Sequence, residues 1–152
     1  MLDHLGIRVV DLAQSKAFYT RALAALGYEV VIEHGDWCGF GKDGNPSFWI
    51  GGSKPSFWRD LHLVATAPIH LAFVAADRAS VDAFYAAALA NGATDNGAPG
   101  VRHEYHSDYY GAFVIDLDGN NLEAVCHESE SLVQAKMKAK AASKTAKTKA
   151  KA

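Results

Sequence analysis

Short apolar segments alternate along the chain with two longer segments of helical periodicity. Residues 4–10 and 70–75 are apolar runs that contain β-branched or aromatic residues, a composition typical of strands. In residues 13–26 and 79–91 the apolar side chains instead recur every three or four positions, as they do on one face of a helix. An aspartate that can cap the helix precedes each of these segments, and a glycine that can end it follows. These flanking residues are Asp11 and Asp77, and Gly27 and Gly92.

Three further strands are expected after each helix. In the first half they are expected at residues 28–33, 36–41 and 47–51, and in the second half at 101–106, 111–117 and 121–126. The sequences Asp43-Gly44-Asn45 and Asp118-Gly119-Asn120 are typical of turns, and each lies between the last two strands of its half. The pattern therefore predicts the order β-α-β-β-β twice.

The two halves also match residue by residue, which indicates an internal repeat. An offset of 66 positions (70 minus 4) aligns His4 with His70 and Phe18-Tyr19 with Phe84-Tyr85. The two Asp-Gly-Asn turns align at an offset of 75 (118 minus 43), so the second copy has about nine extra residues (75 minus 66), which we expect around Asn96 to Arg102.

The repeat defines the domain organisation. We expect one domain over residues 1–132, with modules at about 1–52 and 69–127 and a connector at 53–68. Residues 133–152 contain seven Lys, seven Ala and no acidic residue, and we expect this tail to be disordered or loosely helical.

The predicted fold class is α+β, with two tandem βαβββ modules around a U-shaped, half-open barrel cleft. Each module buries one sheet face under its helix and leaves the other face open, and two open faces together would enclose a ligand. Alternation along the first strand places Leu5, Ile7 and Val9 beneath the helix, and His4 and Arg8 on the open face.

Two histidines and one carboxylate are the candidate metal ligands. His4 and His70 occupy equivalent positions on the open faces, and Glu123 alternates in the last strand with apolar residues. Such a set is typical of open divalent-metal sites. A single strand histidine is more often structural than a ligand, but a glutamate facing an apolar core is costly unless it is paired or bound to metal.

These residues lie in segments that resemble the vicinal oxygen chelate superfamily, which contains glyoxalase I, extradiol dioxygenases, fosfomycin-resistance proteins and bleomycin-binding proteins. The resemblance spans about residues 1–127. It is carried by His4-Leu5-Gly6-Ile7 with Asp11 and Phe18-Tyr19, by Ile69-His70-Leu71-Ala72-Phe73 with Phe84-Tyr85, and by the segment from Tyr109 to Glu123.

The resemblance implies paired modules in a glyoxalase/dioxygenase-like fold and one divalent metal ion (Fe, Mn, Zn or Ni) that chelates neighbouring oxygens of a substrate. The ligands in this superfamily come from the first and last strand of each module, and His4, His70 and Glu123 match three of them. Aligning the two turns places Phe48 opposite Glu123, so the four-ligand site of glyoxalase I is not supported.

Several further residues are candidates for substrate binding. Arg8 either anchors an anionic or carbonyl-bearing substrate or pairs with a carboxylate of the chain. Trp37 and Phe48 are expected to flank the cleft with aromatic rings. The middle strands of the second copy supply hydroxyl, imidazole and guanidinium groups for proton transfer or ring contacts. These are Arg102, Tyr105 and Tyr109, with His103, His106 and Tyr110 beside them.

The negative charge of residues 1–132 argues against nucleic-acid binding by this part of the chain. The net charge of −2 divides into about −9 for residues 1–132 (8 minus 17) and +7 for the tail, so only the tail has a basic character. Two cysteines are too few for a disulfide framework, and neither a signal peptide nor a membrane-spanning segment is recognisable. We therefore expect a cytoplasmic protein with a small-molecule substrate.

Three functions remain open at this stage, one of them a structural or interaction protein in which the basic tail matters and the cleft is vestigial. The first is a metal-dependent enzyme, with lyase, isomerase, dioxygenase or thiol transferase activity. The alternative is a metal-free protein that sequesters an aromatic small molecule or antibiotic in its cleft. The sequence also leaves a homodimer open, because the modules of this superfamily assemble either within one chain or between two.

Overall fold

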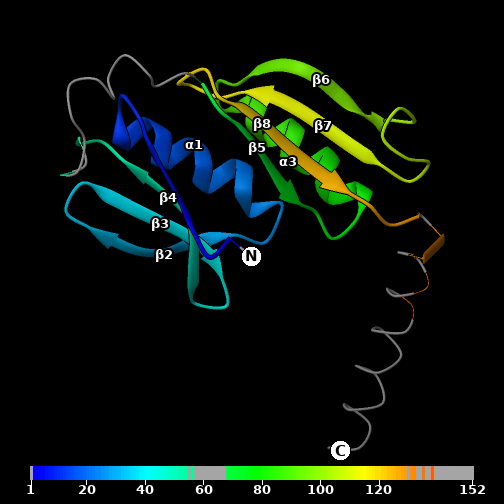
Figure 1. Ribbon diagram of the computed structural model, residues 1–152, viewed down its shortest axis with the longest axis horizontal. Coiled ribbons are helices and arrows are strands. Elements are labelled where there is room, and N and C mark those ends of the chain that lie inside the picture. Colours follow the sequence, from blue (N-terminus) through cyan, green and yellow to red (C-terminus); the bar gives the residue numbers. More distant parts are fainter. Residues whose placement is uncertain are drawn as a thin grey trace, which may run out of the picture.

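The two modules are confirmed as repeated β-α-β-β-β units of an α+β fold (Figure 1). The computed structural model describes residues 2–54, 56 and 68–129, with four further positions at 131, 132, 135 and 138. The first module contains β1 (Leu5–Arg8), α1 (Leu12–Ala24), β2 (Glu29–His34), β3 (Trp37–Lys42) and β4 (Asn45–Gly51). The second contains β5 (His70–Val74), α3 (Arg78–Ala90), β6 (Thr94–Val101), β7 (Tyr110–Ile115) and β8 (Asn121–Cys126).

The predicted connector, residues 53–68, and the tail, residues 133–152, fall largely outside the described residues. Within the part of the chain that is described, no helix combines the length and the apolar character needed to cross a membrane.

Both helices lie within two residues of the predicted bounds, and the predicted aspartates and glycines flank them. The Asp11 carboxylate accepts a hydrogen bond from the Gln14 amide at 3.0 Å, and Asp77 accepts one from the Ser80 amide at 2.7 Å. Each of these bonds satisfies an amide that has no partner inside its helix. Gly27 and Gly92 follow the helices with φ of 78° and 102°, a backbone conformation that glycine adopts without strain.

Each module has one four-stranded sheet, in the orders β1-β4-β3-β2 and β5-β8-β7-β6. The first strand of each module pairs in parallel with its last strand, and the other pairs are antiparallel. This topology places β1 and β5 at the edges of their sheets.

The position of β6 differs from the prediction. The sequence predicts the extra residues of the second copy around Asn96 to Arg102 and a strand at 101–106, whereas β6 spans Thr94–Val101 and turn residues follow it. The pairing of β6 with β7 shifts register between Asp95 and Gly97 and again between Gly97 and Gly100. Bulges at a sheet edge accommodate glycine and proline, which is why a strand here has the composition of a loop.

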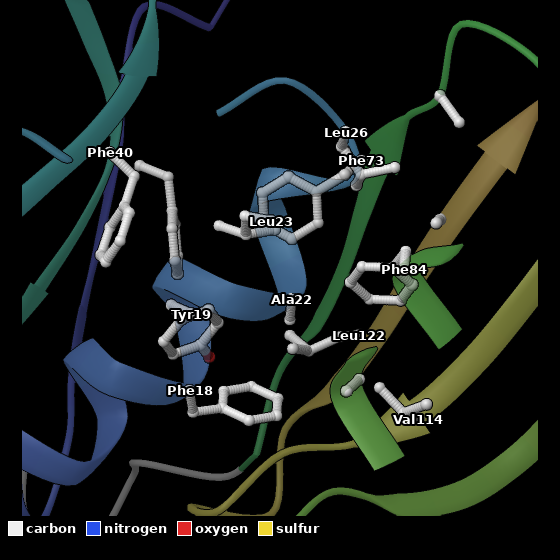
Figure 2. Packing of buried hydrophobic residues seen from close by; sticks show 14 of the residues in the cluster. Phe18, Tyr19, Ala22, Leu23, Leu26, Phe40, Phe73, Phe84, Val114 and Leu122 are labelled. Atoms are coloured by element: carbon white, nitrogen blue, oxygen red, sulfur yellow. The ribbon is translucent and has the colours of Figure 1, made fainter. Parts of the chain in front are cut away.

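The modules join through the helix-facing sides of their sheets. The helices α1 and α3 pack against each other, and Phe73 of β5 contacts Phe48 of β4 and Tyr28, with ring centroids 5.4 and 5.7 Å apart. Buried residues of both modules thus form one hydrophobic cluster (Figure 2). The open faces of the two sheets consequently point away from this shared core.

A buried carboxylate connects the modules within this core. Asp116, 6% exposed, accepts a hydrogen bond from the Tyr19 hydroxyl at 2.5 Å, and Tyr19 is 1% exposed. The amides of Asp118 and Asn120 and the Asn120 side chain also donate to Asp116. Burial, together with the neighbouring Asp116 charge, raises the pKa of the Tyr19 hydroxyl well above its ordinary value.

We expect Tyr19→Phe to lower the free energy of unfolding by about 1–3 kcal/mol, because Asp116 loses one of its donors in a buried environment. Tyr28→Phe is the matched control, since the Tyr28 hydroxyl bonds to no described residue, and we expect it to cost less than about 0.5 kcal/mol. Urea unfolding of the three proteins at pH 7 measures the difference, and equal losses in both variants would contradict the assignment.

The same variant has an expected pH dependence. The pKa of Tyr19 is raised in the folded protein above the ordinary value of 10.0, so the unfolded chain loses this proton first. The Tyr19 hydroxyl therefore contributes its full stabilisation at pH values below 10.0, and this contribution decreases as the pH rises above 10.0. The stability advantage of the parent over Tyr19→Phe should shrink in that alkaline range.

Candidate functional site

The open face of the second sheet carries a buried carboxylate. Glu123 alternates along β8 with Leu122 and Ala124, which lie in the core, so its side chain is on the opposite side of the sheet. Its side chain is nevertheless only 3% exposed. Glu123 Oε2 lies 3.2 Å from Nε2 of His70, and Oε1 accepts a short hydrogen bond from the Tyr109 hydroxyl. The structure thus brings together three residues that the sequence singles out.

The His70 ring is held by its neighbours while its side chain is half exposed. Nδ1 lies 2.9 Å from the side-chain nitrogen of Asn121 and 3.2 Å from the Asn121 carbonyl oxygen. The ring also stacks on Phe113 at 6.3 Å. With the proton on Nδ1, His70 donates to the Asn121 carbonyl and presents the Nε2 lone pair beside Glu123. With the proton on Nε2, it donates to Glu123 instead.

Tyr109 connects Glu123 to a cluster of aromatic and imidazole rings. Its ring centroid lies 4.7 Å from that of Tyr105, 5.3 Å from that of His106 and 5.1 Å from that of His127. Burial, followed by the hydrogen bond to Glu123, raises the pKa of the Tyr109 hydroxyl. The Tyr109 hydroxyl therefore remains a donor to Glu123 at neutral pH.

His127, which is not among the residues predicted from the sequence, also belongs to this cluster. His106 Nε2 lies 2.9 Å from His127 Nδ1, and the two rings stack at 5.3 Å. The period-two alternation that assigns Glu123 to the open face continues four residues beyond it to His127, so this signal was present in the sequence.

His4 does not join His70 and Glu123 within one chain. It lies exposed before β1, and its Nδ1 is 2.7 Å from the carboxylate of Asp3. Among the described residues there is no group of three or more His, Cys, Asp or Glu side chains that could hold a metal ion. The reason is the packing of the modules, because joining the helix-facing sides turns the open faces of β1 and β5 away from each other.

The open face of the first sheet forms a separate hollow of about 800 Å³. Its lining residues include His4, Gly6, Arg8, Trp37 and Trp49. Arg8 and Trp37 were predicted to face the ligand, and both line this hollow. Trp49 was not among the predicted substrate-binding residues.

The strand register explains why Trp49 was missed. Gly6 pairs with Trp49, and Ala72 pairs with Glu123, so Trp49 occupies the position equivalent to Glu123. Alignment of the two turns had placed Phe48 there. The first hairpin contains a bulge that the second lacks: Gly41 pairs with Pro46 and Phe40 with Phe48, so Ser47 is one extra residue between the turn and Trp49. In the second hairpin β7 and β8 pair in continuous register. Alignment of the shared Asp-Gly-Asn motif therefore does not identify which residues of the two last strands are equivalent.

Phe48 lies in the core and not on the open face. It is 3% exposed, and its ring contacts Tyr19 at 5.0 Å as well as Phe73. The other predicted substrate-binding residues lie on or beside the second sheet. Arg102 donates to the Ala98 carbonyl at 2.7 Å, with its guanidinium 5.6 Å from the centre of the Phe113 ring, and Tyr105 is 60% exposed.

Comparison with known proteins identifies relatives of this architecture. The family model described as Glyoxalase/Bleomycin resistance protein/Dioxygenase superfamily matches residues 1–124. A search of curated protein sequences gives no significant match.

Among solved structures, a glyoxalase/bleomycin resistance protein from Albidiferax ferrireducens T118 is 29% identical, with a TM-score of 0.67, covering 82% of this chain and 97% of that one. A glyoxalase/bleomycin resistance protein/dioxygenase family enzyme from Burkholderia phytofirmans PsJN is 23% identical, with a TM-score of 0.62, covering 84% and 98%. At that lower identity the second likeness concerns the fold alone.

We expect Tyr109→Phe to lower the free energy of unfolding by about 1–3 kcal/mol at pH 7, because the buried Glu123 carboxylate loses its hydroxyl donor. Tyr105→Phe is the matched control: it keeps the ring contact with Tyr109, and its hydroxyl bonds to no described residue. Thermal and urea unfolding measure both variants. A Tyr109→Phe protein as stable as the control would show that this hydrogen bond contributes nothing.

Proposed function

The chain belongs to the glyoxalase/bleomycin resistance protein/dioxygenase superfamily, and from this premise we propose that it is a small metal-dependent enzyme acting on a substrate with vicinal oxygens. The observation that supports this most directly is the buried Glu123 carboxylate beside His70 on an open sheet face. We propose that His4, His70 and Glu123 hold one divalent cation, with His4 contributed by a second copy of the chain.

The donor set fits a divalent cation. A carboxylate and two imidazoles suit the first-row transition metals, and a buried carboxylate without a counter-charge is costly. The surroundings also fit, because the Tyr109 hydroxyl orients Glu123 and the Asn121 carbonyl can accept the Nδ1 proton of His70. Metal-binding histidines commonly donate their second ring proton to such an acceptor, which leaves Nε2 free for the metal.

The proposal of a second copy follows from the surfaces that the fold leaves open. The strands β1 and β5 are sheet edges, and Val10 and Val74 beside them are 86% and 64% exposed. Exposed apolar side chains of this size along two edges are typical of an interaction surface. A twofold arrangement would place β1 of one copy against β5 of the other and complete two identical sites.

The residues of the chain have separable tasks at this site. A divalent cation, when bound, supplies positive charge that attracts two neighbouring substrate oxygens and stabilises negative charge forming on them. Tyr109 holds one oxygen of Glu123, so that the other oxygen faces His70. Phe113 supports the His70 ring on one side and lies next to the Arg102 guanidinium, a cationic group suited to an anionic part of the substrate.

We expect His4→Ala and His70→Ala each to abolish stoichiometric binding of a divalent metal, measured by elemental analysis and by titration with Mn²⁺, Zn²⁺ or Fe²⁺. His34→Ala, an exposed histidine at the end of β2, is the control and should bind like the parent. Unchanged metal binding in His70→Ala would reject the metal site. A parent protein that binds no metal would instead support the metal-free binding protein.

Mixing His4→Ala with His70→Ala, each of which should bind no metal alone, tests whether a second copy contributes His4 to the site. After random exchange about half of the dimers contain one chain of each variant, and each of these has one intact site, so about a quarter of the sites should bind metal. A site built within one chain would give no recovery, because every chain in the mixture lacks one ligand. Size-exclusion chromatography of the same samples reports the dimer.

A further inference from the structure

Glycines on the open face of the first sheet leave room for two tryptophan rings, and one of these glycines, Gly6, lines the hollow. A Cβ on Gly51 would lie 2.4–2.6 Å from three atoms of the Trp37 ring, so this ring lies directly against the Gly51 backbone. A Cβ on Gly39 would lie 3.1 Å from Cε3 of Trp49. Gly6 lies between these two side chains, with its Cβ position 3.6 Å from Cζ3 of the Trp37 ring and 3.7 Å from Cβ of Trp49.

Both indoles are available to a ligand. Trp37 and Trp49 are partly exposed, and neither has an aromatic ring contact with another described residue. The core aromatics behave differently, since Phe48 and Phe73 pack on each other or on neighbouring rings. Two indoles over a floor without side chains offer a flat apolar surface, and planar rings bind well to such surfaces.

The hollow also has a charge gradient along β1. Arg8 is exposed at one end and makes no hydrogen bond or ion pair with the described residues. Asp3 lies at the other end and is already paired with His4. Arg8 follows His4 by four residues on the same strand face, a separation of about 13 Å. An anionic group is therefore attracted to the Arg8 end and repelled from the Asp3 end.

We propose that this hollow binds a planar aromatic anion, with its ring over Gly6 beside Trp37 and Trp49 and its carboxylate at Arg8. The inference rests on the proposed function in one respect, because the opposite edge of the ring then points toward His4, where the metal would hold vicinal oxygens. The substrate class is accordingly an aromatic carboxylate that carries two neighbouring oxygens on the side away from the carboxylate. Arg8 suits this role because a guanidinium binds a carboxylate through two parallel hydrogen bonds.

The test is calorimetric titration of the full chain with 2-naphthoate after treatment with a chelator, so that no metal contributes to the affinity. Two probes separate the contributions of ring and charge: 2-naphthalenemethanol keeps the ring without the charge, and cyclohexanecarboxylate keeps the charge without the aromatic face. We expect 2-naphthoate to bind at least about tenfold more tightly than either, a difference of about 1.4 kcal/mol.

Two variants locate the ring and the charge. In Gly6→Ala the new methyl group makes ordinary contacts with Trp37 and Trp49, so the fold is preserved while the floor under the ligand is raised. We expect this variant to bind 2-naphthoate at least about tenfold more weakly. Arg8→Gln should weaken the binding of 2-naphthoate by about tenfold and leave the affinity for 2-naphthalenemethanol unchanged. Arg21→Gln, on α1 and bonded to Asn91, is the matched control and should bind like the parent.

Parent affinity for 2-naphthoate in both Gly6→Ala and Arg8→Gln would overturn the proposal, as would the absence of binding at millimolar probe. The two proposals fail separately. If His70→Ala retains metal but the naphthoate pattern holds, the metal site is wrong and the aromatic-anion hollow stands. If metal binding behaves as proposed and the naphthoate pattern is absent, only the present inference is lost.

Discussion

The joining of the two modules through their helix-facing sides is the constraint on which the rest of the structure depends. The apolar faces of both sheets and both helices pack into one core. In this core the Asp116 carboxylate accepts a hydrogen bond from the hydroxyl of Tyr19, which belongs to the other module. A buried carboxylate that is bonded to several donors tolerates little movement, because displacement would leave it unsatisfied. Both sheets thereby present their open faces outward, and His4, His70, Glu123 and Arg8 lie on or beside these faces.

The two open faces differ in chemistry although the modules share one plan. The second face places an acidic group and an imidazole side by side, with hydroxyl and carbonyl groups that orient them. The first face carries indole rings, glycines and a guanidinium, that of Arg8, without a partner among the described residues, and a tryptophan occupies the position of Glu123. In the function that we propose, the second face supplies ligands for the cation and the first face contacts the organic part of the substrate.

Local features of the fold and of the site could be predicted from the sequence, and long-range features could not. Capping aspartates and terminal glycines define both helices, and alternation correctly assigns Arg8 and Glu123 to open faces, because these signals act over a few residues. The prediction of Phe48 at the position that Trp49 occupies arose because a bulge in β4 adds one residue after the turn, and a shared turn motif does not reveal such a bulge. The packing of the modules depends on contacts between distant segments, and no periodicity in the sequence encodes which side of a sheet meets its repeat.

Placing Trp49 where the second module has Glu123 has a consequence for stereochemistry. In the dimer that we propose, two faces with identical side chains would offer a bound molecule two orientations of equal energy. With an indole at one of the equivalent positions and a carboxylate at the other, these orientations are no longer degenerate. The inequality of the two faces would therefore give the proposed site a direction, and a nearly symmetric molecule would still be held with one chosen end toward the reactive groups.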